Sequence, residues 1–182
     1  MEHKKTSELG IGLVLVITGN GKGKTTSALG QAIRALGHGY RVFFLQFMKG
    51  KSSGELVTIE NNLPGIEIKQ VGSDSWAIKK EIPDEVHIKY AEEGLEIARA
   101  TINSGEYEIV ILDEINVALD FNLLRIDKVV NMIINRPRHV SVILTGRNAP
   151  NKIIEIANTV SCIKEVKHHY NQGTPAQIGI EF

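Results

Sequence analysis

Short apolar runs alternate with amphipathic stretches along this chain, which is the rhythm of repeated βαβ units. Continuous apolar runs predict buried strands at residues 13–17, 42–45, 109–112 and 140–144. Between the first two, residues 25–36 carry apolar side chains at helical spacing, and Gly37-His38-Gly39 ends that helix. This alternation predicts a three-layer α/β domain with a mostly parallel central sheet.

The remaining pattern completes the same domain. It predicts further strands at 66–71 and 160–166 and an edge strand at 176–181, and helices from Pro83 to Ile102, at 124–134 and at 151–157. Residues 48–64 look irregular and are interpreted as a mobile loop beside the ligand. We expect one domain, residues 13–182, after a flexible N-terminal segment, residues 1–12.

Composition limits the function. The 182 residues have zero net charge, yet residues 1–51 hold eight Lys or Arg against two Asp or Glu. With only 5% aromatic residues there is no stacking platform for nucleic acid, so none is expected as a ligand. Cys162 is the single cysteine and is interpreted as a buried strand residue in a reducing compartment. No apolar run could span a membrane, so a cytoplasmic location is expected.

Residues 18–26 form a glycine-rich loop between the first strand and the first helix. Such a loop points its amide N–H groups at phosphate oxygens, and the helix N-terminus adds positive potential. Lys24 can neutralise phosphoryl oxygens, while the Thr25 hydroxyl suits Mg²⁺ or Mn²⁺. The pattern therefore predicts a P-loop NTPase-like domain that binds a nucleotide triphosphate. The candidate nucleotide-binding residues are Asn20, Gly21, Lys22, Gly23, Lys24, Thr25 and Thr26.

This loop is one residue shorter than the usual G-x-x-x-x-G-K-[ST] pattern, whose first glycine would fall at Thr18. A shorter loop can hold the phosphates in a different register. Attack at the γ-phosphate is therefore not implied by the motif.

Polar residues follow two of the predicted strands. Asp113-Glu114 ends the 109–112 run, where carboxylates hold Mg²⁺ in other phosphate-loop proteins, so Thr25, Asp113 and Glu114 are the candidate metal ligands. The alternative is an acidic pair that caps the next helix. Arg147 follows Leu144-Thr145-Gly146 and is suited either to phosphate or to a surface ion pair.

Two further features carry candidate chemistry. Trp76, the only tryptophan, lies in a polar stretch and is interpreted either as a stacking surface for a large flat ligand or as a minor hydrophobic contact. His168-His169 falls near the end of the 160–166 strand. Adjacent side chains on a strand point to opposite faces, so we expect no zinc site there.

Several motifs together resemble one known family, the ATP:corrinoid adenosyltransferases of the cobalamin pathway (the CobA/CobO/BtuR type). They cover roughly residues 13–182 in the family's order, and the shortened loop belongs to the same pattern. The matching segments are residues 18–26, Gly37-His38-Gly39, residues 46–50, Leu112-Asp113-Glu114, Arg136-Pro137, residues 144–147, residues 166–169 and residues 176–180.

The resemblance implies transfer of the 5′-deoxyadenosyl group of ATP to the Co(I) of a reduced corrinoid, with triphosphate leaving. Co(I) is already a strong nucleophile, which fits a sequence with no obvious activating base. Lys24 and Glu114 are then the candidate catalytic residues. Trp76 matches an aromatic that contacts the corrinoid in similar enzymes, although Asp74 stands where those enzymes have phenylalanine. The resemblance also implies a homodimer and a reduced flavoprotein as electron donor.

Two other functions use the same motifs. A switch or regulatory ATPase would use the loop and Asp113-Glu114 to release orthophosphate. A small-molecule kinase would release ADP and would need an arginine-rich lid, which the sequence does not show.

Overall fold

The central feature of the computed structural model is one parallel sheet. The structure describes residues 10–50, 53–73 and 85–181, and within them six strands pair in the order β3-β2-β4-β5-β1-β6. All of the pairs are parallel. The strands are β1 (Val14–Thr18), β2 (Val42–Phe47), β3 (Ile66–Val71), β4 (Ile109–Asp113), β5 (Ser141–Thr145) and β6 (Thr159–Cys162).

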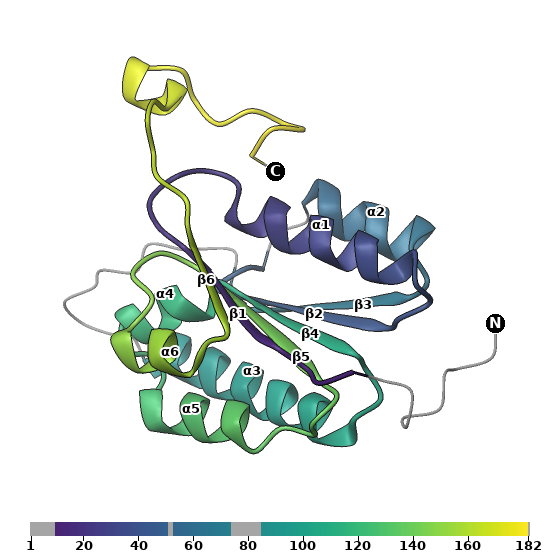
Figure 1. Ribbon diagram of the computed structural model, residues 1–182. Coiled ribbons are helices and arrows are strands. Elements are labelled where there is room, and N and C mark those ends of the chain that lie inside the picture. Colours follow the sequence, from purple (N-terminus) through teal and green to yellow (C-terminus); the bar gives the residue numbers. More distant parts are fainter. Residues whose placement is uncertain (1–9, 51–52, 74–84, 182) are drawn as a thin grey trace.

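Helices cover both faces of this sheet, as Figure 1 shows. The helices are α1 (Lys24–Leu36), α2 (Gly54–Asn62), α3 (Glu85–Ser104), α4 (Ile115–Asp120), α5 (Ile126–Ile134) and α6 (Asn151–Ile156). Helices α1 and α2 lie on one face, and the other four lie on the opposite face. The predicted three-layer α/β fold with a parallel sheet is thus confirmed.

The period of two along β2 divides the core between the two faces. Phe43 and Leu45 pack in the cluster beneath α3 and its neighbours, whereas Val42 and Phe44 pack in the cluster beneath α1. All four side chains are almost fully buried. A strand that is covered on both faces must be apolar at every position, which is why the continuous apolar runs predicted these strands correctly.

The order of the strands determines where the candidate site lies. β4 lies between β2 and β5, and β5 pairs with β1, so the carboxyl ends of four neighbouring strands meet at one edge of the sheet. The loop after β1 and the acidic pair after β4 therefore come together there, as expected for ligand sites in open α/β sheets.

The prediction of an irregular loop over residues 48–64 was wrong, because Gly54–Asn62 forms helix α2. Only Ile59 of this helix is fully buried. A nine-residue helix with one buried anchor carries almost no periodic signal, and its helical state depends on packing against the sheet.

The C-terminal predictions were also partly wrong. β6 ends at Cys162, and residues 176–181 form no edge strand, since 176–177 are irregular and 178–181 form a turn. Cys162 is exposed rather than buried, because β6 is the last strand of the sheet and its four residues are all exposed. The chain leaves the sheet after Ile163 and crosses above the carboxyl edge (Figure 1).

Gly94 and Gly30 differ in how closely other residues pack against them, so substitutions at these positions test the packing of the helices. A Cβ on Gly94 of α3 would stand 2.7 Å from both the Phe47 ring and Val71, whereas a Cβ on Gly30 of α1 would meet no described atom within 4 Å. We expect Gly94→Ala to lower the free energy of unfolding by about 1 kcal/mol or more, because overpacking outweighs the gain in helix propensity. Gly30→Ala, the matched control, should raise it by roughly 0.5–1 kcal/mol. Urea denaturation measures both, and an unchanged midpoint in Gly94→Ala would contradict the packing.

Candidate functional site

The glycine-rich loop is shaped by two different constraints. Gly23 has φ 110° and directly precedes α1, so the loop turns into the helix through a backbone conformation that glycine tolerates best. Gly19, which also has a positive φ of 96°, and Gly21 pack against the chain that follows β6. An added Cβ would stand 2.4 Å from the Ile163 carbonyl oxygen at Gly19 and 2.8 Å from the Ile163 side chain at Gly21. The Gly21 N–H also donates to the Ile163 carbonyl at 2.8 Å.

Lys24 is the buried cation of this loop. It is the first residue of α1, it is 7% exposed, and its Nζ donates to the Gly21 carbonyl at 2.7 Å. Burial lowers the pKa of Lys24, and the nearby charge of Glu114 opposes that shift. An ammonium held inside the loop by a carbonyl oxygen can exchange that partner for a phosphate oxygen.

Asp113 is the polar centre of the site and is 0% exposed. Its Oδ1 accepts hydrogen bonds from Thr25 Oγ1 at 2.9 Å and from Thr145 Oγ1 at 2.6 Å. Its Oδ2 accepts one from Gln46 Nε2 at 3.1 Å. The carboxylate thereby joins α1 to the ends of β5 and β2. Thr145 and Gln46 were not among the predicted site residues, although both stand in segments that carried the family resemblance.

Glu114 lies beside Asp113 in a strained position. Its φ of 62° is left-handed, which is uncommon outside glycine, and its N–H donates to Thr145 Oγ1 at 2.9 Å. It precedes α4, but its side chain makes no capping hydrogen bond to the described helix, so the alternative of an acidic cap is not supported. Burial, followed by the charge of Asp113, raises the pKa of Glu114.

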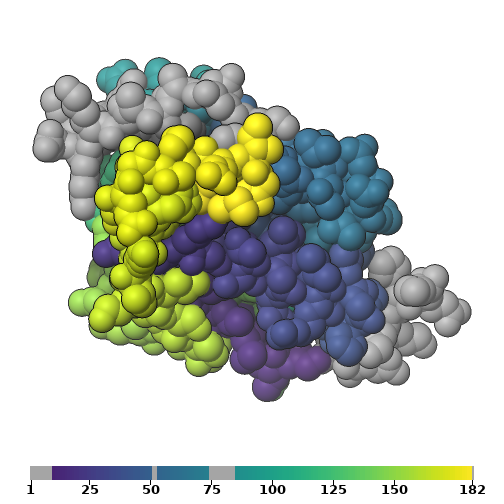
Figure 2. Space-filling view, turned by 90° about the horizontal axis from the view of Figure 1, so that it is seen from above, coloured from purple at the N-terminus to yellow at the C-terminus, as the bar shows by residue number. Residues whose placement is uncertain are grey.

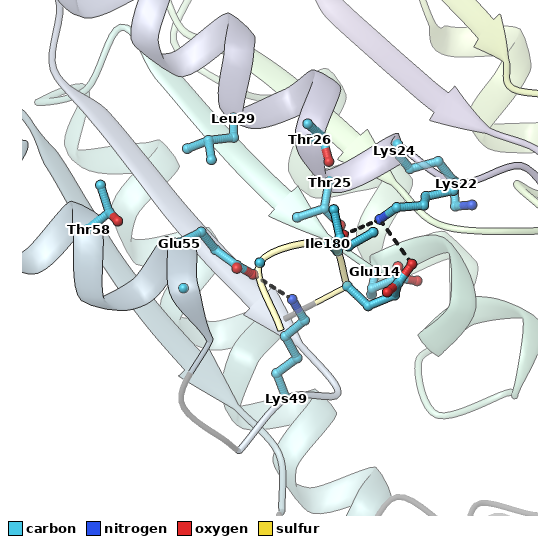
Figure 3. A pocket seen from close by; sticks show the side chains of 14 residues that line it. Lys22, Lys24, Thr25, Thr26, Leu29, Lys49, Glu55, Thr58, Glu114 and Ile180 are labelled. Carbon is cyan, nitrogen blue, oxygen red and sulfur yellow. Dashed lines mark hydrogen bonds and ion pairs between the residues drawn. The ribbon is translucent and has the colours of Figure 1, made fainter. Parts of the chain in front are cut away.

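Lys24, Thr25 and Glu114 line one side of a cavity of about 460 Å³, within the roughly 300–1,000 Å³ typical of small-molecule sites. The opposite side comes from the region that was interpreted as a loop. Lys49 after β2 pairs with Glu55 of α2 at 2.9 Å, as Figure 3 shows. Burial, the largest single effect, would raise the pKa of Glu55, but the hydrogen bonds from Lys49, the Glu55 backbone and Gln46, together with the charge of Lys49, outweigh it and lower the pKa to about 2. Sequence reasoning missed Lys49 and Glu55 as site residues because it missed α2.

The C-terminal segment forms part of the wall of the cavity. Gly179, Ile180 and Glu181 are among its lining residues, and Figure 2 shows this segment lying across the nucleotide-loop side of the molecule. Lys22 Nζ donates to the Ile180 carbonyl and lies 3.7 Å from Glu181 Oε1. Lys22, predicted to contact phosphate, is therefore held by the tail.

The other predicted residues divide into three groups. Gly23 and Thr26 line the cavity with Lys22, Lys24 and Thr25. Asn20 is an exposed loop residue. Arg147 is exposed just after β5 and is not among the described residues that line the cavity. Its positive charge nevertheless lowers the pKa values of both Lys24 and Glu114. Trp76 lies outside the described residues.

The acidic group fits a hard divalent cation. Thr25, Asp113 and Glu114 present oxygen ligands beside the loop lysine, and Mg²⁺ and Mn²⁺ prefer such oxygens. The 2.9 Å bond between Thr25 and Asp113 already holds two of these oxygens together.

No helix among the described residues is both long and apolar enough to cross a membrane.

The raised pKa of Glu114 leads to a stability prediction. Its protonated form is favoured by folding, so this contribution is complete below the ordinary pKa of 4.5 and is lost as the pH rises through the higher folded value. We therefore expect Glu114→Gln to raise the melting temperature by a few degrees at pH 7, and the gain to shrink towards pH 4. Scanning calorimetry of the ligand-free protein measures this. Glu155→Gln, at an exposed position of α6, is the control; equal shifts in both variants would rule out the burial effect.

Comparison with known proteins agrees with this geometry. Residues 11–182 match the family model described as ATP:corrinoid adenosyltransferase BtuR/CobO/CobP. The chain is 36% identical to the corrinoid adenosyltransferase of Escherichia coli strain K12, over 94% of this chain and 86% of the relative. It is 38% identical to that of Pseudomonas aeruginosa, over 94% and 84%. It is 34% identical to corrinoid adenosyltransferase CobA of Salmonella typhimurium, over 94% and 86%. The chain belongs to the ATP:corrinoid adenosyltransferase family.

Proposed function

We infer that this protein transfers the 5′-deoxyadenosyl group of ATP to the Co(I) of a reduced corrinoid. Family membership over residues 11–182, together with a phosphate loop that opens into the cavity, is the observation that carries this inference. In the reaction a bond forms between cobalt and C5′ of ATP. The bond from C5′ to its oxygen breaks, and triphosphate leaves with the electron pair.

The residues of the site fit the charge that develops in this reaction. Negative charge grows on the leaving triphosphate, so buried cations and aligned amides lower the barrier when they are already in place. At one end of the cavity Lys24 supplies the buried cation, and the N-terminus of α1 supplies the aligned amides. Arg147 is proposed as a further phosphate contact, since its charge already acts on this site.

Thr25, Asp113 and Glu114 are proposed to hold the divalent cation. Asp113 would keep its place through Thr145 and Gln46, which donate to it from neighbouring strands. A bound Mg²⁺ or Mn²⁺ would supply Lewis-acid stabilisation of the triphosphate. Glu114, raised in pKa by burial, would be held ionised by the cation and by Lys24.

Some parts of the assignment rest on the sequence and the family resemblance alone. We propose that residues 13–182 work as one domain after the segment 1–12, in a cytoplasmic homodimer that receives its electron from a reduced flavoprotein. We also propose that Trp76 contacts the corrinoid.

The deciding experiment is anaerobic incubation with ATP, Mg²⁺ and chemically reduced cob(I)alamin. We expect the light-sensitive spectrum of adenosylcobalamin, with one triphosphate released per adenosyl group transferred. Lys24→Ala should reduce kcat by about 100- to 1,000-fold, as loss of one preorganised charge in a dry site does. Lys152→Ala, at an exposed lysine on α6, is the matched control. Orthophosphate without a corrinoid product would support the regulatory ATPase, and ADP would support a kinase.

The role of Trp76 has its own test. We expect Trp76→Ala to leave the Kd for ATP unchanged and to raise KM for the corrinoid or lower its turnover, because stacking area is lost only on the corrinoid side. Trp76→Phe, which keeps an aromatic ring, should retain most of the activity. ATP affinity is measured by calorimetry and turnover by the adenosylcobalamin spectrum. Wild-type corrinoid kinetics in Trp76→Ala would exclude the stacking role.

A further inference from the structure

The C-terminal tail gathers three metal-ligating side chains outside the nucleotide site. His168, His169 and Glu181 each offer one ligand atom, and these atoms all lie within 4.8 Å of one another. All three residues are half-buried. They belong neither to the glycine-rich loop nor to the acidic group around Asp113.

The backbone explains how neighbouring histidines come to share one side. His168 is extended, with φ −134° and ψ 134°, but His169 begins a short 3₁₀ helix, His169–Gln172. The rings therefore stack, with centroids 4.6 Å apart and planes at 28°. The expectation that they point to opposite faces of a strand was wrong, because no strand continues to this point. Gly173, with φ 83°, ends the 3₁₀ helix in a left-handed conformation.

Two of the ligand atoms make no hydrogen bond within the described part of the chain, and Glu181 Oε1 lies between Lys22 Nζ, 3.7 Å away, and His169 Nε2. His169 Nε2 and Glu181 Oε1 are almost shielded from solvent and have no hydrogen-bond partner among the described residues. They lie 3.5 Å apart. Two shielded polar atoms that make no hydrogen bond favour a ligand that both can bind.

The Glu181 carboxylate is already oriented. Its other oxygen, Oε2, accepts the backbone N–H of Gln177 at 2.8 Å. This hydrogen bond, followed by the nearby charges of His169, Lys22 and His168, lowers the pKa of Glu181. An ionised carboxylate whose second oxygen is hydrogen-bonded is the usual state of a carboxylate that binds a metal.

We propose that His168, His169 and Glu181 bind one borderline divalent transition-metal ion, of which Zn²⁺ is the representative. Two imidazole nitrogens and one carboxylate oxygen form a set of three protein ligands that zinc accepts in tetrahedral sites, with the fourth position left to water. Mg²⁺ prefers six oxygens in an octahedron and does not suit this set. The tail site and the Asp113 group therefore differ in metal preference.

Ligation has a specific consequence at His168. Its Nδ1 accepts the Tyr170 N–H at 3.2 Å. If zinc binds Nδ1, it takes the same lone pair; if zinc binds Nε2, Nδ1 carries the proton and cannot accept. In both cases zinc replaces this long hydrogen bond, so His168 is the weakest of the three ligands.

Zinc calorimetry tests the proposal on the full-length, tag-free protein after removal of metals and in excess Mg²⁺. We expect one equivalent of Zn²⁺ to bind saturably. His169→Gln and Glu181→Gln should each weaken binding by at least about tenfold, and His168→Gln by less. His38→Gln, which removes an exposed histidine from the turn after α1, should leave zinc binding unchanged.

A second measurement reports on ligand geometry. Co²⁺ added in place of Zn²⁺ should give the intense visible absorption of a tetrahedral ion, and this absorption should disappear in Glu181→Gln. Circular dichroism confirms that the variants are folded. Absence of saturable zinc binding, or equal affinity in wild type, His169→Gln and Glu181→Gln, would overturn the proposal and leave only the His169–Glu181 ion pair. Neither result bears on adenosyl transfer, which has its own product assay.

Discussion

The buried carboxylate of Asp113 is the interaction on which the site depends. A fully buried charge costs several kcal/mol unless hydrogen bonds and neighbouring charges compensate it. Here three donors provide that compensation, and they come from α1, β2 and β5. They can meet only because β4 lies between β2 and β5 in the sheet. The Asp113 carboxylate therefore ties the N-terminus of α1 to the ends of strands β2 and β5.

Glu114 shows the opposite balance. Its backbone is left-handed and its carboxylate is buried beside a second carboxylate, so the folded protein bears a cost at this residue. A hydrogen bond from its N–H to Thr145 holds the strained backbone in place. Such a residue suits the proposed cation site, since a positive ion beside the carboxylate would offset this cost. The rigid support of Asp113 makes the strain at Glu114 tolerable.

The sequence predicted those features that follow from local pattern or from burial on both faces. The buried strands, the first helix and the loop lysine have such signals, and all were correctly placed. Helix α2 has one buried residue, Ile59, so its helical state depends on tertiary contacts that no periodicity reveals. The same error hid Lys49 and Glu55. The sequence explained the loop glycines by phosphate binding alone. The structure adds a second reason at Gly19 and Gly21, where Ile163 approaches too closely for a side chain.

The tail could not be predicted because its structure rests on few, widely separated polar contacts. Beyond Ile163 most residues are exposed, so apolar burial does little to fix their course. Glu181 meets Lys22 of the glycine-rich loop on one side and His169 on the other. Both neighbours compete for the same oxygen, Oε1. Glu181 therefore links the glycine-rich loop to the histidines of the tail, and this link is invisible to any local pattern because Lys22 and Glu181 are far apart in the sequence.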